Sequence, residues 1–139
     1  FSNKIKESLK KKIAKDLKIF GKCIWLNNEK KMDFFTAMFG GGPAYFFYIL
    51  DCFDKIIKKN GVSVDDSLSL LTTLLEGTLV QLKSKSVNFK ESIQKVASKG
   101  GTTEEALKVF DRNSALYNLL ETAINSAKDK SSKISQKLK

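Results

Sequence analysis

Residues 98–105 read Ser-Lys-Gly-Gly-Thr-Thr-Glu-Glu and join two segments with the apolar spacing of helices, residues 89–97 and 106–110. The two glycines permit a tight reversal that includes a positive φ. Thr102, followed three positions later by Glu105, predicts a capping box that opens the second helix. A helix start has unpaired N–H groups and a partial positive charge, so it favours a carboxylate or a phosphate. Taken alone, however, the stretch is most simply a helix–loop–helix connection.

The rest of the chain carries helical patterns as well. Apolar residues recur at intervals of three and four in residues 4–20, 29–39, 43–59, 65–82 and from about 114 onward. The first half of the 43–59 segment is apolar on every face, so we expect it to be buried centrally or inside a dimer. From residue 29 on, the sequence predicts an all-α architecture.

Residues 23–26, Cys-Ile-Trp-Leu, interrupt this pattern and predict a short buried strand between Gly21 and Asn27. A lone strand has nothing to pair with and is unstable by itself. We therefore interpret residues 1–28 as the last helix and strand of a larger αβ domain whose earlier strands are missing. The chain also opens with Phe1 rather than Met, which we expect of a processed or truncated product.

The charge of +10 lies mainly at the two ends of the chain. Residues 1–18 carry a net +5 and residues 128–139 a net +4, which leaves +1 for the segment between them. Arg112 is the only arginine, so the sequence does not favour nucleic-acid binding. The chain also lacks an apolar run of about 18 residues, so it does not favour a membrane span. The lysine-rich ends leave open a weaker hypothesis of binding to an anionic surface.

The chain has no histidine and only two cysteines, Cys23 and Cys52, which do not have the spacing of metal ligands. We therefore expect no metal site and no histidine-based catalytic triad. Two cysteines without a secretory signal favour a reduced, cytoplasmic protein.

Three motifs, taken in order along the chain, resemble one family. Residues 36–45, Thr-Ala-Met-Phe-Gly-Gly-Gly-Pro-Ala-Tyr, resemble the T-A-L-S-G-S-G-P-A-Y signature of pyrroline-5-carboxylate reductase. Residues 98–103 resemble the S-P-G-G-T-T loop of that family, and residues 21–26 are similar to its G-K-x-x-W-x strand at the domain junction. The resemblance covers essentially the whole chain, and the motifs have the order and separation of the family.

The resemblance implies a two-domain oxidoreductase of which this chain is the C-terminal part. Residues 1–28 would be a remnant of the N-terminal Rossmann domain, whose G-x-G-x-x-G fingerprint the chain lacks. Residues 29–139 would be the all-α dimerisation and substrate-binding domain, of the 6-phosphogluconate dehydrogenase C-terminal-like type. The family forms homodimers that interlock, and also larger rings of dimers.

The family reduces 1-pyrroline-5-carboxylate to L-proline, the last step of proline biosynthesis, with a hydride from NADPH or NADH and no metal. By resemblance, Ser98 and the backbone amides of Gly100, Gly101 and Thr102 would hold the substrate carboxylate. Thr103 would be the catalytic residue, with a hydrogen bond to the ring nitrogen. The missing domain would bind most of the cofactor, so we expect this chain alone to be inactive.

Three positions depart from the family pattern. Phe39 and Gly41 replace serines, and Lys99 replaces the proline of the loop. These changes fit a diverged enzyme, and they also fit a stand-alone helical oligomerisation module that has lost catalysis. The sequence alone leaves both alternatives open.

Overall fold

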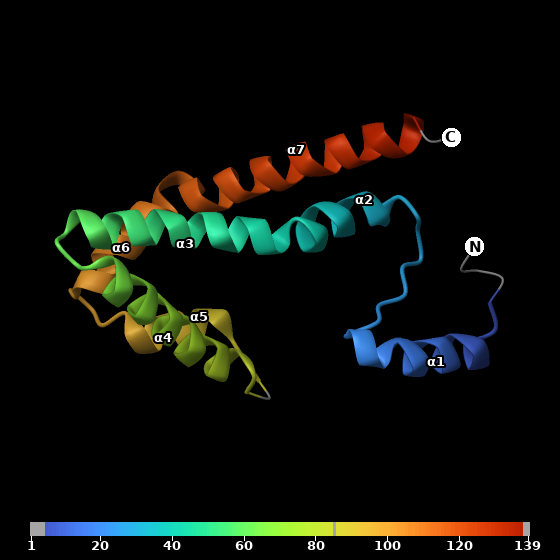
Figure 1. Cartoon of the computed structure of the whole chain (residues 1–139), viewed down its shortest axis with the longest axis horizontal. Helices are drawn as coiled ribbons and strands as arrows, with labels where there is room; N and C mark the ends of the chain where they lie inside the picture. The colour runs from blue at the N-terminus through green and yellow to red at the C-terminus, as the bar shows by residue number, and fades with distance from the viewer. Residues whose placement is uncertain (1–4, 85, 138–139) are drawn as a thin grey trace. The chain divides into compact units, whose positions relative to one another are not determined.

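The computed structural model describes residues 5–84 and 86–137, and the regular secondary structure in these ranges is helical (Figure 1). This agrees with the all-α architecture expected from the apolar spacing. The elements are α1 (Glu7–Asp16), the 3₁₀ turn η2 (Leu17–Phe20), α2 (Lys31–Phe35), the π-helical turn η3 (Thr36–Gly40), α3 (Gly42–Lys59), α4 (Val64–Leu82), α5 (Phe89–Val96), α6 (Thr102–Asp111), the 3₁₀ turn η4 (Arg112–Ser114) and α7 (Ala115–Lys137).

The strand predicted at residues 23–26 is not formed, and this prediction was wrong. The segment after Gly21 is irregular backbone. A strand needs a neighbour for its backbone hydrogen bonds, and the described residues supply none. The segment instead contacts α1, since the Lys10 ammonium lies 5.9 Å from the centroid of the Trp25 ring. The proposed domain boundary at residue 28 stays a prediction.

The chain divides into two compact units, one of residues 1–40 with 124–139 and one of residues 41–123. In the first unit, α2 is joined to the C-terminal part of α7. The Asp33 carboxylate accepts a hydrogen bond of 2.8 Å from the Ser131 hydroxyl, 98 positions later in the sequence. Ala37 of η3 is 4% exposed and is the buried apolar side chain of this unit among the described residues.

In the second unit, α3 packs against α4 through a polar contact between the two helices. Ser67 is fully buried and donates a hydrogen bond of 2.6 Å to the carboxylate of Asp54 on α3. The other oxygen of Asp54 forms an ion pair of 2.6 Å with Lys58, one turn further along α3. Leu71, one turn after Ser67, is 6% exposed. A buried hydroxyl is stable here because Asp54 satisfies it.

These contacts make part of the stability depend on pH. Hydrogen bonds from Lys58 and then from Ser67 hold the pKa of Asp54 below its usual value. A carboxyl group whose pKa is lowered by folding stabilises the protein above its unfolded pKa, about 3.9, and this contribution is lost as the pH falls through the folded pKa. We expect Asp54→Asn to lower the Tm at pH 7, and the difference from wild type to shrink below about pH 4.

Thermal melts monitored by circular dichroism at several pH values would measure this difference. Asp129→Asn, which removes an exposed carboxylate from α7, is the control and should change the Tm equally little at each pH. A Tm difference for Asp54→Asn that does not vary with pH would contradict the assignment.

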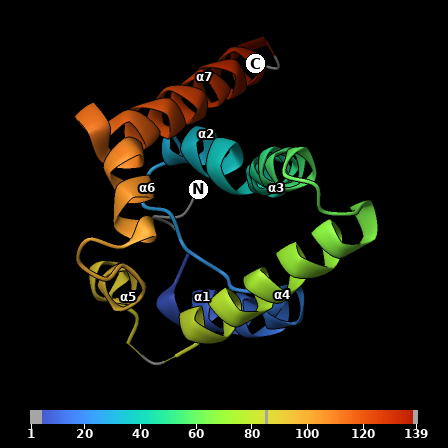
Figure 2. The same ribbon diagram turned by 90° about the vertical axis from the view of Figure 1, so that its left-hand side faces the viewer.

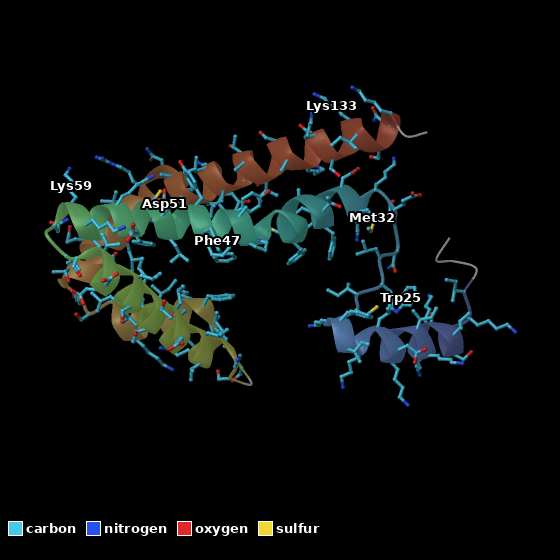
Figure 3. The ribbon with its side chains drawn as sticks, viewed as in Figure 1. Trp25, Met32, Phe47, Asp51, Lys59 and Lys133 are labelled. Carbon is cyan, nitrogen blue, oxygen red and sulfur yellow. The ribbon has the colours of Figure 1, made fainter. Side chains whose placement is uncertain are left out.

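The most unusual feature of the described residues is how few apolar side chains they bury. Ala37 and Leu71 are the buried hydrophobic residues, whereas Phe46, Phe47 and Tyr48 of α3 are 65%, 72% and 70% exposed. Figure 3 shows Phe47 in the first half of α3, with Asp51 one turn later. Of the two expectations for this segment, burial at the centre of the chain was therefore wrong. Burial inside a dimer stays a prediction.

Candidate functional site

The predicted site lies in the connection between α5 and α6, where Figure 2 shows the chain passing from α4 through α5 into α6. After Val96 the chain reverses over a few residues, and the Gly101 N–H donates a hydrogen bond of 2.9 Å to the carbonyl of Ser98. Gly100 has a φ of +73°, the left-handed conformation predicted for this turn. Residues 98–101 thus form a closed turn that leads directly into the first turn of α6.

Steric constraints explain why positions 100 and 101 of this turn are glycines. At Gly100 an L side chain would be strained by the positive φ. At Gly101 a Cβ atom would lie 2.6 Å from the Ser98 hydroxyl oxygen and 3.0 Å from its carbonyl oxygen. The Ser98 side chain therefore lies directly against the Gly101 backbone, and only glycine allows this approach.

The predicted capping box was wrong in its residues. Thr102 is already the first residue of α6, and Gly101 is the N-cap, without a side-chain hydrogen bond. Because the helix begins one residue earlier than expected, Glu104 rather than Glu105 stands at the third helical position. The Glu104 carboxylate accepts a hydrogen bond of 2.6 Å from the Gly100 N–H. Glu105 pairs with Lys108 at 2.6 Å instead.

The backbone N–H groups proposed to bind a substrate carboxylate thus differ in whether they can still donate a hydrogen bond. The N–H groups of Gly100 and Gly101 are used within the turn. The N–H groups of Thr102 and Thr103 lie in the first turn of α6, where a helix offers no acceptor. Together with the positive end of the helix dipole, these two amides are available to an anion.

Thr103 also lies at the edge of a cavity of about 390 Å³ within the second unit. It is half-buried, whereas Ser98, Gly100 and Thr102 are exposed. The cavity wall is mainly apolar and comes from the end of α4, from Val87 in the connection to α5 and from one face of α5: Thr78, Gln81, Leu82, Val87, Phe89, Ser92, Ile93 and Val96. The sequence placed Thr103 on a helix start but did not reveal this cavity, because its wall comes from two other helices.

Glu104 is the residue at this turn that the sequence interpretation missed. A glutamate at the third helical position is a recognised partner for amides before the helix, so the signal was present. With Thr102 as the N-cap, the third helical position falls on Glu105, so the capping-box pattern pointed to the wrong glutamate. At the start of α3, Gly41 is the N-cap and Pro43 stands in the first turn.

The described residues contain no group of three or more His, Cys, Asp or Glu side chains arranged to hold a metal ion. In the same part of the chain, none of the helices combines the length and the apolar character needed to cross a membrane.

Comparison with known proteins identifies the family. Residues 29–134 match the family model described as pyrroline-5-carboxylate reductase dimerisation. The chain belongs to this family.

The relatives and solved structures agree with this assignment. The pyrroline-5-carboxylate reductase of Pseudomonas aeruginosa is 33% identical over 122 residues, which are 88% of this chain and 44% of that protein. The Aquifex aeolicus enzyme is 33% identical over 106 residues, 76% of this chain and 40% of that protein. This chain therefore spans less than half the length of these relatives.

Solved structures of pyrroline-5-carboxylate reductases share the fold. The Coxiella burnetii structure has a TM-score of 0.81 at 25% identity and covers 93% of this chain and 47% of its own. The Plasmodium falciparum structure, which has NADP bound, has a TM-score of 0.76 at 26% identity and covers 92% of this chain and 48% of its own.

Proposed function

We propose that this chain is the C-terminal part of a pyrroline-5-carboxylate reductase, contributing the substrate turn and the dimer interface. The observation that carries the proposal is the match of residues 29–134 to the dimerisation family of that enzyme. The complete enzyme would reduce 1-pyrroline-5-carboxylate to L-proline with NADPH or NADH, as the last step of proline biosynthesis. The free thiols of Cys23 and Cys52 suit a reducing compartment such as the cytoplasm.

The residues of this chain do not fit a dinucleotide cofactor by themselves. The sequence has no G-x-G-x-x-G fingerprint, and the described residues include no βαβ unit that could present one to a pyrophosphate. The cofactor would be bound mainly by an N-terminal Rossmann domain, of which we propose residues 1–28 to be the last part. This chain's own contribution is to bind and orient the imino acid.

The turn between α5 and α6 suits that task. The substrate carboxylate would accept hydrogen bonds from the Thr102 and Thr103 N–H groups, beside the Ser98 hydroxyl, at the positive end of α6. The Thr103 hydroxyl would bond the ring nitrogen. The mainly apolar cavity beside Thr103 supports this arrangement, because the ring of the substrate consists largely of methylene groups. Gly100 and Gly101 would shape the turn, since their amides are already engaged.

Dimerisation would bury the apolar surface that the chain leaves exposed. Phe46, Phe47 and Tyr48, which together make up the aromatic surface of α3, are each more than 60% exposed. Exposed apolar patches of this kind are uncommon in monomers and are typical of subunit interfaces. The function therefore includes a homodimer, and rings of such dimers in the complete enzyme.

A reductase assay with 1-pyrroline-5-carboxylate and NADPH tests the proposal. We expect no NADPH oxidation by the 139-residue chain, and oxidation when the same residues follow a complete dinucleotide-binding domain. Activity of the chain alone would contradict the proposal that a separate N-terminal domain binds the cofactor. If the protein that includes the dinucleotide-binding domain is dimeric but inactive, the alternative is favoured, an oligomerisation module without catalysis. The replacements at Phe39, Gly41 and Lys99 also point to this alternative.

A further inference from the structure

The turn that precedes α6 is closed by a side chain of the helix itself. The Gly100 N–H donates a hydrogen bond of 2.6 Å to Glu104 Oε2, four residues later, and the Gly101 N–H donates to the Ser98 carbonyl at 2.9 Å. Hydrogen bonds to an ionised carboxylate are shorter and stronger than those between neutral groups.

The composition of the turn explains why it needs such a contact. Gly100 and Gly101 have more backbone freedom than any other residue type, and Gly100 must hold a φ of +73°. Position 99 is a lysine, where the family pattern has a proline whose ring would restrict φ. The hydrogen bond from Gly100 to Glu104 ties the freest residue of the turn to the rigid first turn of α6.

We propose that Glu104 is a positioning residue that holds the turn in the shape required for binding of the imino acid. The proposal rests on the function proposed above. With Gly100 held by Glu104, the Ser98 hydroxyl stays against Gly101 and the free N–H groups of Thr102 and Thr103 stay beside it. In this role Glu104 does not contact the ligand. Its carboxylate accepts the hydrogen bond of the Gly100 N–H, an amide that the ligand does not require.

The opposite role would have the opposite effect. If the ligand carboxylate had to use the Gly100 N–H, Glu104 would be a competitor, and its removal would strengthen binding. The amides of Thr102 and Thr103 favour the positioning role, since they can donate hydrogen bonds to a carboxylate while Glu104 stays in place.

The test uses the ¹⁵N-labelled 139-residue chain and L-proline, the product of the proposed reaction, as the ligand. NMR titration gives the Kd for L-proline, and hydrogen exchange reports whether the Gly100 amide is protected. The variants are Glu104→Ala, which removes the acceptor, and Glu104→Gln, which keeps a neutral one. Glu105→Gln is the matched control, because Glu105 pairs with Lys108 rather than with the turn.

We expect Glu104→Ala to weaken L-proline binding about tenfold and to speed exchange of the Gly100 amide by a similar factor, since one charge-assisted hydrogen bond is lost. Glu104→Gln should lie between Ala and wild type, and Glu105→Gln should match wild type. Equal or tighter binding by Glu104→Ala, in a chain whose wild type binds L-proline, would overturn the positioning role alone. A wild-type chain that does not bind L-proline would overturn the proposed site and the role of Glu104 with it.

Discussion

Thr103→Ala is expected to lower turnover by roughly 10²–10³-fold in the reductase that joins these residues to a complete dinucleotide-binding domain. This is the usual effect of removing one hydrogen-bond donor placed against a reacting group. The proposed hydrogen bond from the Thr103 hydroxyl to the ring nitrogen would hold the imine and favour the charge that develops on nitrogen. The same change should lower the Tm by only a few degrees, because Thr103 is half-buried at the edge of a cavity and its loss leaves no enclosed void.

Thr78→Ala is the matched control for this prediction. Thr78 lines the same cavity, but its hydroxyl donates a hydrogen bond of 2.9 Å to the Leu74 carbonyl within α4 and is not free for a ligand. We expect Thr78→Ala to change turnover less than about threefold, an effect below about 0.7 kcal/mol. Steady-state kinetics with 1-pyrroline-5-carboxylate measure both variants. Wild-type turnover in Thr103→Ala would refute its catalytic assignment.

The second large effect is expected at the aromatic surface of α3. The double substitution Phe46→Asp with Phe47→Asp should convert the dimer to a monomer at micromolar concentration. In a twofold dimer each substitution acts twice, and burying an unpaired carboxylate costs several kcal/mol. The fold of the chain should survive, since the two side chains are 65% and 72% exposed and contribute little to its own core.

Size-exclusion chromatography with light scattering would give the mass, and circular dichroism the helix content. Lys59→Glu changes the net charge by the same amount at the other end of α3 and should leave the dimer intact. A double variant that remains dimeric would place the interface elsewhere. A wild-type chain that is monomeric at the same concentration would contradict the proposed dimerisation.

Local patterns predicted most of what is local in this protein. The apolar spacing identified the helices, because one buried face of a helix recurs every three or four residues whatever lies against it. The glycines at 100 and 101 predicted the reversal before α6, because its positive φ and close backbone approach are properties of a few neighbouring residues. The predicted site residues are therefore where the sequence put them, in one turn at one helix start.

Errors arose where a local signal had more than one solution. Thr102 and Gly101 could each have been the N-cap of α6, and the turn geometry selected Gly101, which moved the capping carboxylate from Glu105 to Glu104. The apolar spacing placed the start of the next long helix at residue 65, whereas α4 begins at Val64 with Ser63 as its N-cap, whose hydroxyl accepts a hydrogen bond of 3.1 Å from the Asp66 N–H. One residue of difference in a helix start changes which side chain reaches the free amides.

The sequence by itself determined the helical class, the family and the turn that carries the candidate site, because each of these depends on the order of neighbouring residues. The tertiary structure decided which distant side chains meet. The Asp33 carboxylate accepts a hydrogen bond from Ser131, which lies 98 positions later in the sequence. The Asp54 carboxylate of α3 accepts one from the buried Ser67 of α4. It also showed that the aromatic face of α3 is uncovered and that residues 23–26 form no strand. Both outcomes have one physical reason: an apolar face and a strand edge are stable only against a partner, and a sequence pattern does not contain the partner.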